Sequence, residues 1–374
     1  MHRDEGHEIV NRPRRYLKRA VMLTIAAVSI YLVIPSVIAT FSSWPQLARL
    51  EDGSLVIMTL FMAASLVCLW IMLGLCLRSR RWVLMATSQL SSSAVARIVP
   101  GGAATATAVQ YRLLKDAGVD NETAGTGMTV ATLLNFAVLF ALPILAVPAL
   151  LSGTTVSSAL LNGAIAAAIS FVAAAILGGL FLFWDRPLRA LGRAIDGIAE
   201  RLGRRHTDAE PRADRLIASR DLIRSYLADR WYWVALASFG KWGFEYLALV
   251  MAVRGVGHDD MSSLLLLAFV TASLLGKIPF TPGGLGFVEA GLTGTLTLAG
   301  MSAGDAATAT LAFRLVSYWL PIPIGAAAYG AHRISMRRRG IEVPSLEDEV
   351  LDDLPVIPIT SSGDDRGDER FDRS

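Results

Sequence analysis

Charged residues are scarce in this sequence. Only 18% of its 374 residues are charged, and 53% are hydrophobic, whereas about a quarter of the residues in a typical soluble protein carry charge. The apolar residues fall in runs of about 20 or more, which is enough for a helix to cross the hydrocarbon core of a bilayer. The shortage of charge therefore excludes an ordinary soluble protein and predicts an all-α polytopic membrane protein.

Cysteine and histidine are also scarce. Cys68 and Cys76, the two cysteines of the chain, lie about 12 Å apart along one predicted helix, which is too far for a disulfide. The five histidines lie at termini, in loops or at span ends, so we expect neither a metal site nor an intramembrane histidine relay. No Ser/His/Asp set, P-loop or dinucleotide fingerprint occurs in a usable context. The sequence thus favours a transporter without cofactors, and it leaves enzymatic activity open.

Six apolar segments are predicted to cross the membrane: residues 20–41, 54–77, 122–151, 156–184, 231–253 and 305–332. The basic residues that give the net charge of +3 flank these segments, which indicates orientation in the membrane and not nucleic-acid binding. Placing every basic segment in the cytoplasm puts both termini in the cytoplasm and requires an even number of crossings. The expected location of the protein is the plasma membrane. Two irregular regions, 82–114 and 262–300, fit as re-entrant hairpins beside six spans, or as two crossings each in a total of eight.

The expected organisation is a basic cytoplasmic arm at residues 1–19, a transmembrane domain at 20–335 and an acidic cytoplasmic tail at 336–374. The tail is rich in Asp, Ser, Gly and Pro, a composition that predicts disorder. The cytoplasmic loop at 185–230 carries apolar residues at helical spacing. That spacing fits amphipathic helices on the inner leaflet, and it fits a solvated helical hairpin equally well.

The two irregular regions share a pattern. Each has an apolar leg, a cation, a Pro-Gly-Gly break and a leg of small residues, reading RIVPGG at 97–102 and KIPFTPGG at 277–284. Pro100 and Pro282 remove a backbone donor, and the paired glycines allow the chain to reverse. The leg at 287–299 would rise only about 20 Å as a helix, so a re-entrant hairpin is favoured over two full spans.

Hairpins that enter from opposite faces would form an inverted-topology repeat around a substrate near the midplane. The alternative is two unrelated breaks that only shape packing. Both second legs begin directly after glycines, so their helix N-termini would face the meeting point and favour an anion there. The glycines concerned are Gly101, Gly102, Gly283, Gly284 and Gly286.

Six ionisable residues fall within or beside the apolar regions: Arg97, Lys241, Glu245, Lys277, Glu289 and Arg314. Charges at membrane depth are costly, so we expect them to pair or to face a cavity. Lys241 and Glu245 stand four residues apart and are predicted to pair. Glu289 and Arg314 form the second expected pair. Arg97 and Lys277 are left over, and they either face an anionic substrate or reach towards the interface.

The run PGGLGFVEAGLTGTLTLAGMSAGDAATATLAFRLVSYWLP at 282–321 resembles the C-terminal signature of the lysylphosphatidylglycerol synthase transmembrane-region family, the flippase-like membrane proteins. That signature is a PGGLG turn, a glutamate three residues later (here Glu289), a Gly-rich spacer and a span with a central arginine (here Arg314). The segment 100–119 is similar to the family's first Pro-Gly motif and its basic leg, with Arg112 and Lys115. Ala103 and Ala104 replace the Gly-Glu pair of many members, so no carboxylate role is expected at the first hairpin. The resemblance covers about residues 20–335.

The resemblance implies movement of an anionic phospholipid, or of a polyprenyl-phosphate-linked lipid, between leaflets. The soluble aminoacyl-transferase domain of bifunctional members is not expected here. The residues predicted to contact the lipid headgroup are Arg97, Gly101, Gly102, Arg112, Lys277, Gly283, Gly284, Gly286 and Arg314, and those with structural or coupling roles are Pro100, Pro282, Lys241, Glu245 and Glu289. The alternatives are a glycosyl- or phosphotransferase acting on a polyprenyl phosphate, and a non-catalytic scaffold for a cell-envelope enzyme. Membrane lipids, a second copy of the chain and such an envelope enzyme are the candidate partners.

Overall fold

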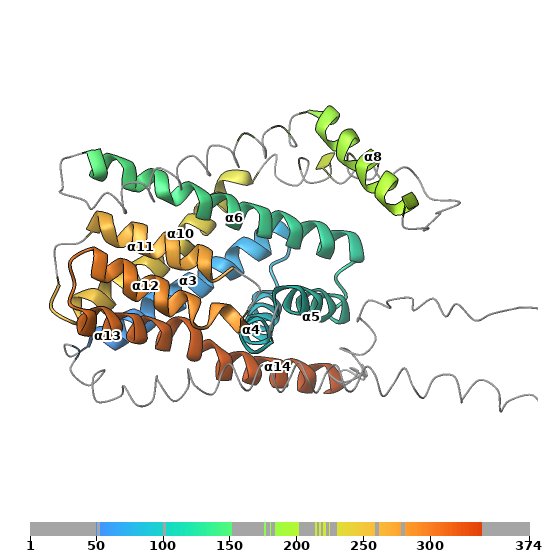
Figure 1. Cartoon of the computed structure of the whole chain (residues 1–374). Coiled ribbons are helices and arrows are strands. Elements are labelled where there is room, and N and C mark those ends of the chain that lie inside the picture. The colour runs from blue at the N-terminus through green and yellow to red at the C-terminus, as the bar shows by residue number, and fades with distance from the viewer. Residues whose placement is uncertain are drawn as a thin grey trace, which may run out of the picture.

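The computed structural model describes residues 53–99, 102–151, 184–201, 230–258, 262–277 and 281–338, with a few single positions besides. All regular structure within these residues is helical, which confirms the all-α prediction (Figure 1). The predicted arm at 1–19, the segment 20–41, most of 156–184, most of the loop 202–229 and the tail after 338 lie outside the described residues.

The helices follow one another as α3 Ser54–Cys76, α4 Trp82–Ile98, α5 Gly102–Asp116, α6 Asn121–Leu151, α8 Asp185–Arg201, α10 Trp231–Arg254, α11 Ser262–Leu275, η1 Pro282–Gly284, α12 Phe287–Leu298, α13 Ala303–Arg314, η2 Leu315–Trp319 and α14 Pro321–Arg338. Three stretches are long and apolar enough to cross a membrane, namely Ser54–Cys76, Asn121–Leu142 and the continuous Ala303–Arg338. Each coincides with a predicted span, and α10 forms a helix of 24 residues at the position of another.

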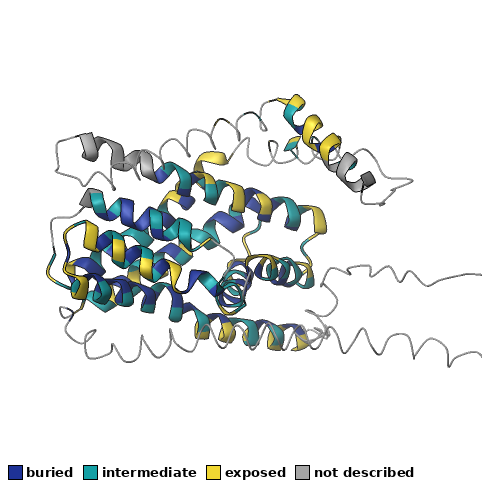
Figure 2. Ribbon diagram, viewed as in Figure 1, coloured by how far each residue is buried: buried dark blue, intermediate teal, exposed yellow. Residues whose placement is uncertain are grey.

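The outer surface of the bundle is apolar. Large hydrophobic side chains such as Val56, Leu60, Leu133 and Leu236 are more than half exposed, and exposed positions run along the outer faces of the long helices (Figure 2). Lipid tails can cover such side chains without the cost that water would impose. The exposure of these residues therefore agrees with a membrane-embedded bundle.

Helices α4 and α5 form the first helical hairpin. Gln110 of α5 donates a side-chain hydrogen bond of 2.7 Å to Gln89 of α4. At the open end, the guanidinium of Arg81 donates to the carbonyl of Ala117 at 2.7 Å, so the chain enters and leaves the hairpin at the same place. The helices have 17 and 15 residues, which makes them about 25 and 23 Å long.

Helices α11 and α12 form the second hairpin, with 14 and 12 residues. Between them Gly283, Gly284 and Gly286 have φ values of +53°, +72° and +82°, a region that only glycine enters readily. A Cβ at Gly283 would also collide with the ring of Tyr318, and one at Gly284 would lie 2.8 Å from the Cα of Gly276. The reversal therefore needs glycine both for its backbone angles and for close packing.

The first hairpin packs against the C-terminal end of α3, and the N-terminal end of α3 contacts a different apolar cluster, to which the second hairpin contributes. The C-terminal end of α3, at Leu77, clusters with Leu84 and Leu114 of the first hairpin. The N-terminal end, at Leu55, packs against the cluster that contains Leu265 and Leu296 of the second hairpin. Figure 1 shows α4 and α5 on one side of the bundle and α11 and α12 on the other.

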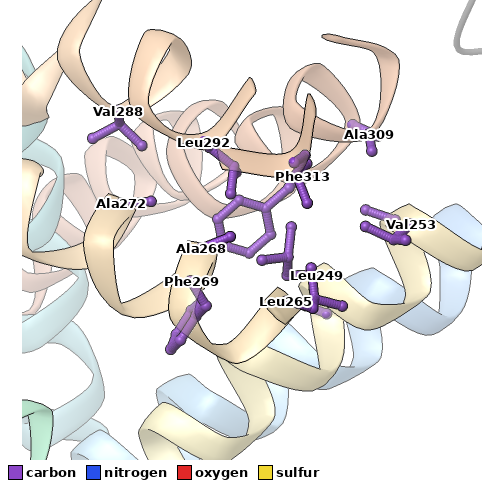
Figure 3. Packing of buried hydrophobic residues seen from close by; sticks show 14 of the residues in the cluster. Leu249, Val253, Leu265, Ala268, Phe269, Ala272, Val288, Leu292, Ala309 and Phe313 are labelled. Atoms are coloured by element: carbon purple, nitrogen blue, oxygen red, sulfur yellow. The ribbon is translucent and has the colours of Figure 1, made fainter. Parts of the chain in front are cut away.

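The largest apolar cluster contains residues of α10, α11, α12 and α13, together with residues of α3 and α6. Phe269 of α11 lies at its centre, with edge-on ring contacts to Trp242, Tyr246 and Phe313. Figure 3 shows Phe269 and Phe313 with Leu249, Leu265 and Leu292 around them. This packing fixes the second hairpin against α10 and α13, which carry Lys241, Glu245 and Arg314.

Candidate functional site: a charged cavity between the two hairpins

A cavity of about 470 Å³ lies between the two hairpins and the long helices. Four cationic side chains line it, those of Arg97, Lys241, Lys277 and Arg314, together with the carboxylate of Glu245. Polar uncharged side chains complete the lining, among them Ser65, Gln89, Ser92, Gln110, Thr132, Asn135, Ser273, Ser317 and Tyr318. A polar cavity within an apolar bundle is typical of a site for a charged or polar ligand.

The predicted pair of Arg314 and Glu289 is present. The Nε of Arg314 donates to Oε1 of Glu289 at 2.6 Å, although the two residues belong to α13 and α12. Arg314 also stacks on the ring of Tyr318, 4.3 Å from its centroid. The other oxygen of Glu289 accepts the N–H of Gly286 at 2.7 Å, at the start of α12. Glu289 therefore fixes Arg314 to the glycine turn.

This geometry changes one expectation from the sequence. The N-terminus of α12 was expected to offer its N–H groups to an anionic ligand, but the chain's own Glu289 takes the N–H of Gly286. Gly286 and Gly284 also lie outside the cavity lining, whereas Gly283 and Gly102 belong to it. The protein supplies its own anion at this helix end.

Lys241 and Glu245 form the second predicted pair, one turn apart on α10. Their Nζ and Oε2 atoms are 2.9 Å apart, and the other oxygen of Glu245 accepts a longer bond of 3.4 Å from Ser65 of α3. Because both side chains line the cavity, this pair adds no net charge to it.

Arg97 has carbonyl partners. Its guanidinium donates to the carbonyls of Ser93 at 2.8 Å and Ser317 at 3.1 Å. The carbonyl of Ser317 is open to a side chain because the residue four positions later is Pro321, which has no N–H. Ser317 belongs to a π-helical turn, η2, and such turns often occur at functional sites.

Lys277 lies in the turn two residues after the end of α11. Its side chain is solvent-accessible and lines the cavity. Its Nζ lies 5.7 Å from the ring centroid of Phe136 and 5.6 Å from that of Trp242, distances at which the ring faces attract a cation weakly. Within the described residues, no carboxylate lies at salt-bridge distance from Lys277 or Arg97. The lining and its two ion pairs thus hold four cations against two carboxylates, a surplus of two positive charges.

Tyr318 connects the two hairpins. Its hydroxyl donates to the carbonyl of Arg97 at 2.6 Å, three residues before Pro100, and lies 3.4 Å from the carbonyl of Pro282. Tyr318 is not among the site residues predicted from the sequence, although its position four residues after Arg314 places both on one helix face. Gln89, Gln110 and Asn135 were also missed; isolated amides inside apolar helices were the available signal.

The other predicted site residues lie elsewhere. Arg112 is on α5 but outside the cavity lining, and Pro100 and Gly101 are outside the described residues. Pro282 is buried within η1. In the described part of the chain no group of three or more His, Cys, Asp or Glu side chains could hold a metal ion.

Comparison with known proteins gives a family match over most of the chain. The family model described as "Lysylphosphatidylglycerol synthase TM region" matches residues 14–325. A UPF0104 membrane protein of Methanothermobacter thermautotrophicus is 34% identical over 91 residues, which cover 24% of this chain and 27% of that protein. A second UPF0104 membrane protein of that organism is 27% identical over 93 residues, covering 25% and 28%. The chain thus spans about a quarter of the length of these relatives.

Proposed function

This chain belongs to the lysylphosphatidylglycerol synthase TM region family, and we propose that this integral membrane protein moves an anionic lipid between the two leaflets. The substrate class is an anionic phospholipid or a polyprenyl-phosphate-linked lipid. Its phosphate enters the cavity between the hairpins, while its acyl or prenyl chains stay in the surrounding lipid.

The surplus of positive charge in the cavity carries this proposal. Both carboxylates near the cavity already have cationic partners, in Lys241 and Arg314. Lys277 and Arg97 have no carboxylate at salt-bridge distance in the described residues, at a depth where an uncompensated charge costs several kcal/mol. A lipid phosphate between these two cations would offset that cost, because charge-assisted hydrogen bonds to phosphate are strong.

Arg314 has a different role from Lys277. Its Nε is already bonded to Glu289, and its Nη2 lies 3.4 Å from the carbonyl of Gly283. The guanidinium is therefore held rigidly at one wall of the cavity. There its positive charge attracts an anion, but it offers the ligand few free hydrogen-bond donors. We propose that Arg314 stabilises the glycine turn and attracts the lipid phosphate into the cavity.

The arrangement of the hairpins supports a mechanism of alternating access. We propose six spans and two re-entrant hairpins that enter from opposite faces as an inverted repeat, with both termini in the cytoplasm and the protein in the plasma membrane. The short helices of α11 and α12, at 14 and 12 residues, suit such a hairpin because a full crossing needs about 20. Opening one hairpin at a time would expose the cavity to one leaflet at a time.

The test is lipid transfer in vesicles that contain the full chain. The probe is phosphatidylglycerol that carries a fluorescent label on its headgroup side. An added quencher reports how fast the labelled lipid leaves one leaflet. Lys277→Gln should reduce the transfer rate at least tenfold, whereas Lys115→Gln should leave it within twofold. Lys115 is an exposed lysine of α5 outside the cavity lining, so the control removes an equal charge.

Two results would count against the proposal. Equal transfer by the protein and by empty vesicles for every anionic lipid offered would remove the translocator function. Formation of a new product from a sugar or phosphate donor and a polyprenyl phosphate would favour a transferase. Neutral phosphatidylcholine serves as the reference lipid, because the charge surplus predicts little transfer of a headgroup without net charge.

A further inference from the structure

A second pocket lies at the C-terminal end of α3, away from the cavity between the hairpins. Its volume is about 450 Å³, within the range of about 300–1,000 Å³ that is usual for ligand sites. Three arginines and three aromatic residues line it, together with four further residues of α3 and the following turn: Arg78, Arg80, Arg230, Trp82, Tyr232, Trp233, Ile71, Gly74, Leu75 and Ser79. We call it the interfacial pocket.

The interfacial pocket and the charged cavity lie on opposite faces of α3. Successive residues of a helix are turned by about 100°. The residues of α3 that line the cavity near this end are Leu69, Met72 and Leu73, and those that line the interfacial pocket are Ile71, Gly74 and Leu75. Their mean directions differ by roughly half a turn, so α3 separates the two spaces.

The interfacial pocket lies at the level where a lipid headgroup would be. It follows directly after the 23-residue apolar helix α3, which is long enough to cross the membrane. Trp82, Tyr232 and Trp233 are each at least half exposed, and exposed Trp and Tyr residues are enriched where lipid meets water. The arginines therefore surround a space at the boundary between acyl chains and solvent.

Arg78 occupies a position at which glycine is the usual residue. The N–H groups of Arg78 and Ser79 bond back to the carbonyls of Leu75 and Gly74, which is the pattern of a Schellman motif. Arg78 has the left-handed φ of +50°, the one positive φ of a non-glycine residue in the described part of the chain. A residue whose backbone is held in a strained conformation often serves a function at that place.

From these observations we propose that the interfacial pocket binds the phosphate of an anionic phospholipid in the adjacent leaflet. The guanidinium groups of Arg78, Arg80 and Arg230 would donate to the phosphate oxygens, as basic pockets between membrane helices do. The exposed aromatic rings would pack against the glycerol region and the upper acyl chains. This site is separate from the proposed transport cavity and does not depend on transport.

Arg78→Gly gives the sharpest test. Glycine accepts a left-handed φ without strain, so this variant should unfold at a higher temperature than the wild type while it loses one lipid ligand. We expect the affinity for phosphatidylglycerol, measured by native mass spectrometry of the full chain in phosphatidylcholine nanodiscs, to fall about fivefold, the effect of one basic residue at an anionic lipid surface. Arg80→Gln combined with Arg230→Gln should lower it further.

The measurements are made in the Lys277→Gln background, so that binding in the transport cavity contributes little. Arg338→Gln is the matched control, because Arg338 is an exposed arginine at the end of α14 outside the interfacial pocket. Wild-type affinity in both Arg78→Gly and the double variant would overturn the proposal. An equal loss in Arg338→Gln would do so as well, because it would indicate a general effect of charge.

A further arm separates a lipid from a free anion. Inorganic phosphate at millimolar concentration should not displace phosphatidylglycerol, because it lacks the glycerol and acyl chains that pack on the aromatic residues. Complete displacement by inorganic phosphate would assign the interfacial pocket to a soluble anion and would overturn the lipid assignment. Loss of transfer by Lys277→Gln, with phosphatidylglycerol still bound, would separate this site from the transport site.

Discussion

The hydroxyl of Tyr318 donates a hydrogen bond of 2.6 Å to the backbone carbonyl of Arg97. The two residues are far apart in the sequence, and the same hydroxyl lies 3.4 Å from the carbonyl of Pro282. One side chain in the π-helical turn after α13 therefore contacts the broken ends of both hairpins. Any movement that separates the hairpins at the cavity must break or exchange this bond.

Tyr318→Phe should weaken this connection without changing the shape of the core. Tyr318 is only 2% exposed, and loss of its hydroxyl leaves the carbonyl of Arg97 without this donor, which typically costs about 1–3 kcal/mol. Thermal unfolding in detergent should show a lower midpoint, and lipid transfer should change in rate. Tyr111→Phe is the control, since no hydrogen bond of that hydroxyl is found in the described part of the chain. Equal midpoints in the two variants would contradict the prediction.

Arg314→Gln should destabilise the protein more than a surface arginine change. It leaves the carboxylate of Glu289, whose side chain is 25% exposed, with one partner fewer in an apolar bundle. Removing one partner of a buried ion pair costs about 3–5 kcal/mol, and the partial exposure of Glu289 places the expectation at the low end. Arg314→Gln with Glu289→Gln should recover part of this loss, which a double-mutant cycle in denaturant would measure. Arg337→Gln, at the exposed end of α14, should have no comparable effect.

The ion pairs could be predicted from the sequence because few charges occur in the apolar regions. With so few partners available, Lys241 had only Glu245 one turn away, and Arg314 had only Glu289 left. The glycine turn was equally readable, since Pro282, Gly283 and Gly284 leave a helix few ways to continue. The structure adds what spacing cannot provide, namely that Glu289 also occupies the N–H of Gly286.

Gly283→Ala should be far more damaging than an alanine change elsewhere on the same hairpin. Gly283 has a φ of +53° and no room for a Cβ, which would collide with the ring of Tyr318. Gly294 lies in the middle of α12 with nothing within 4 Å of an added Cβ, so Gly294→Ala should be neutral or slightly stabilising, by up to about 1 kcal/mol. Unfolding midpoints of the two variants check the contrast, and a smaller loss for Gly283→Ala than for Gly294→Ala would refute it.

The contacts between the hairpins could not be predicted from the sequence. Nothing in the spacing of Arg97 and Ser317 indicates that they meet, because their helices are brought together only by tertiary packing. The interfacial pocket was missed for a related reason. Arg78, Arg80 and Arg230 were interpreted only as orientation signals, since the sequence does not show that the end of α3 lies beside the start of α10. The aromatic residues beside them were the available hint.

Pro321→Ala tests whether a missing N–H determines the position of Arg97. Alanine at this position would restore a donor for the carbonyl of Ser317, which at present accepts from the guanidinium of Arg97 at 3.1 Å. The helix should then become more regular and more stable, while Arg97 loses an acceptor and lipid transfer slows. Pro323→Ala is the matched control, because it likewise restores a donor, here for the carbonyl of Trp319, which does not line the cavity. Higher unfolding midpoints in both variants, with slower transfer only in Pro321→Ala, is the expected pattern. Unchanged transfer in Pro321→Ala would mean that the contact with Ser317 does not position Arg97 for the lipid phosphate.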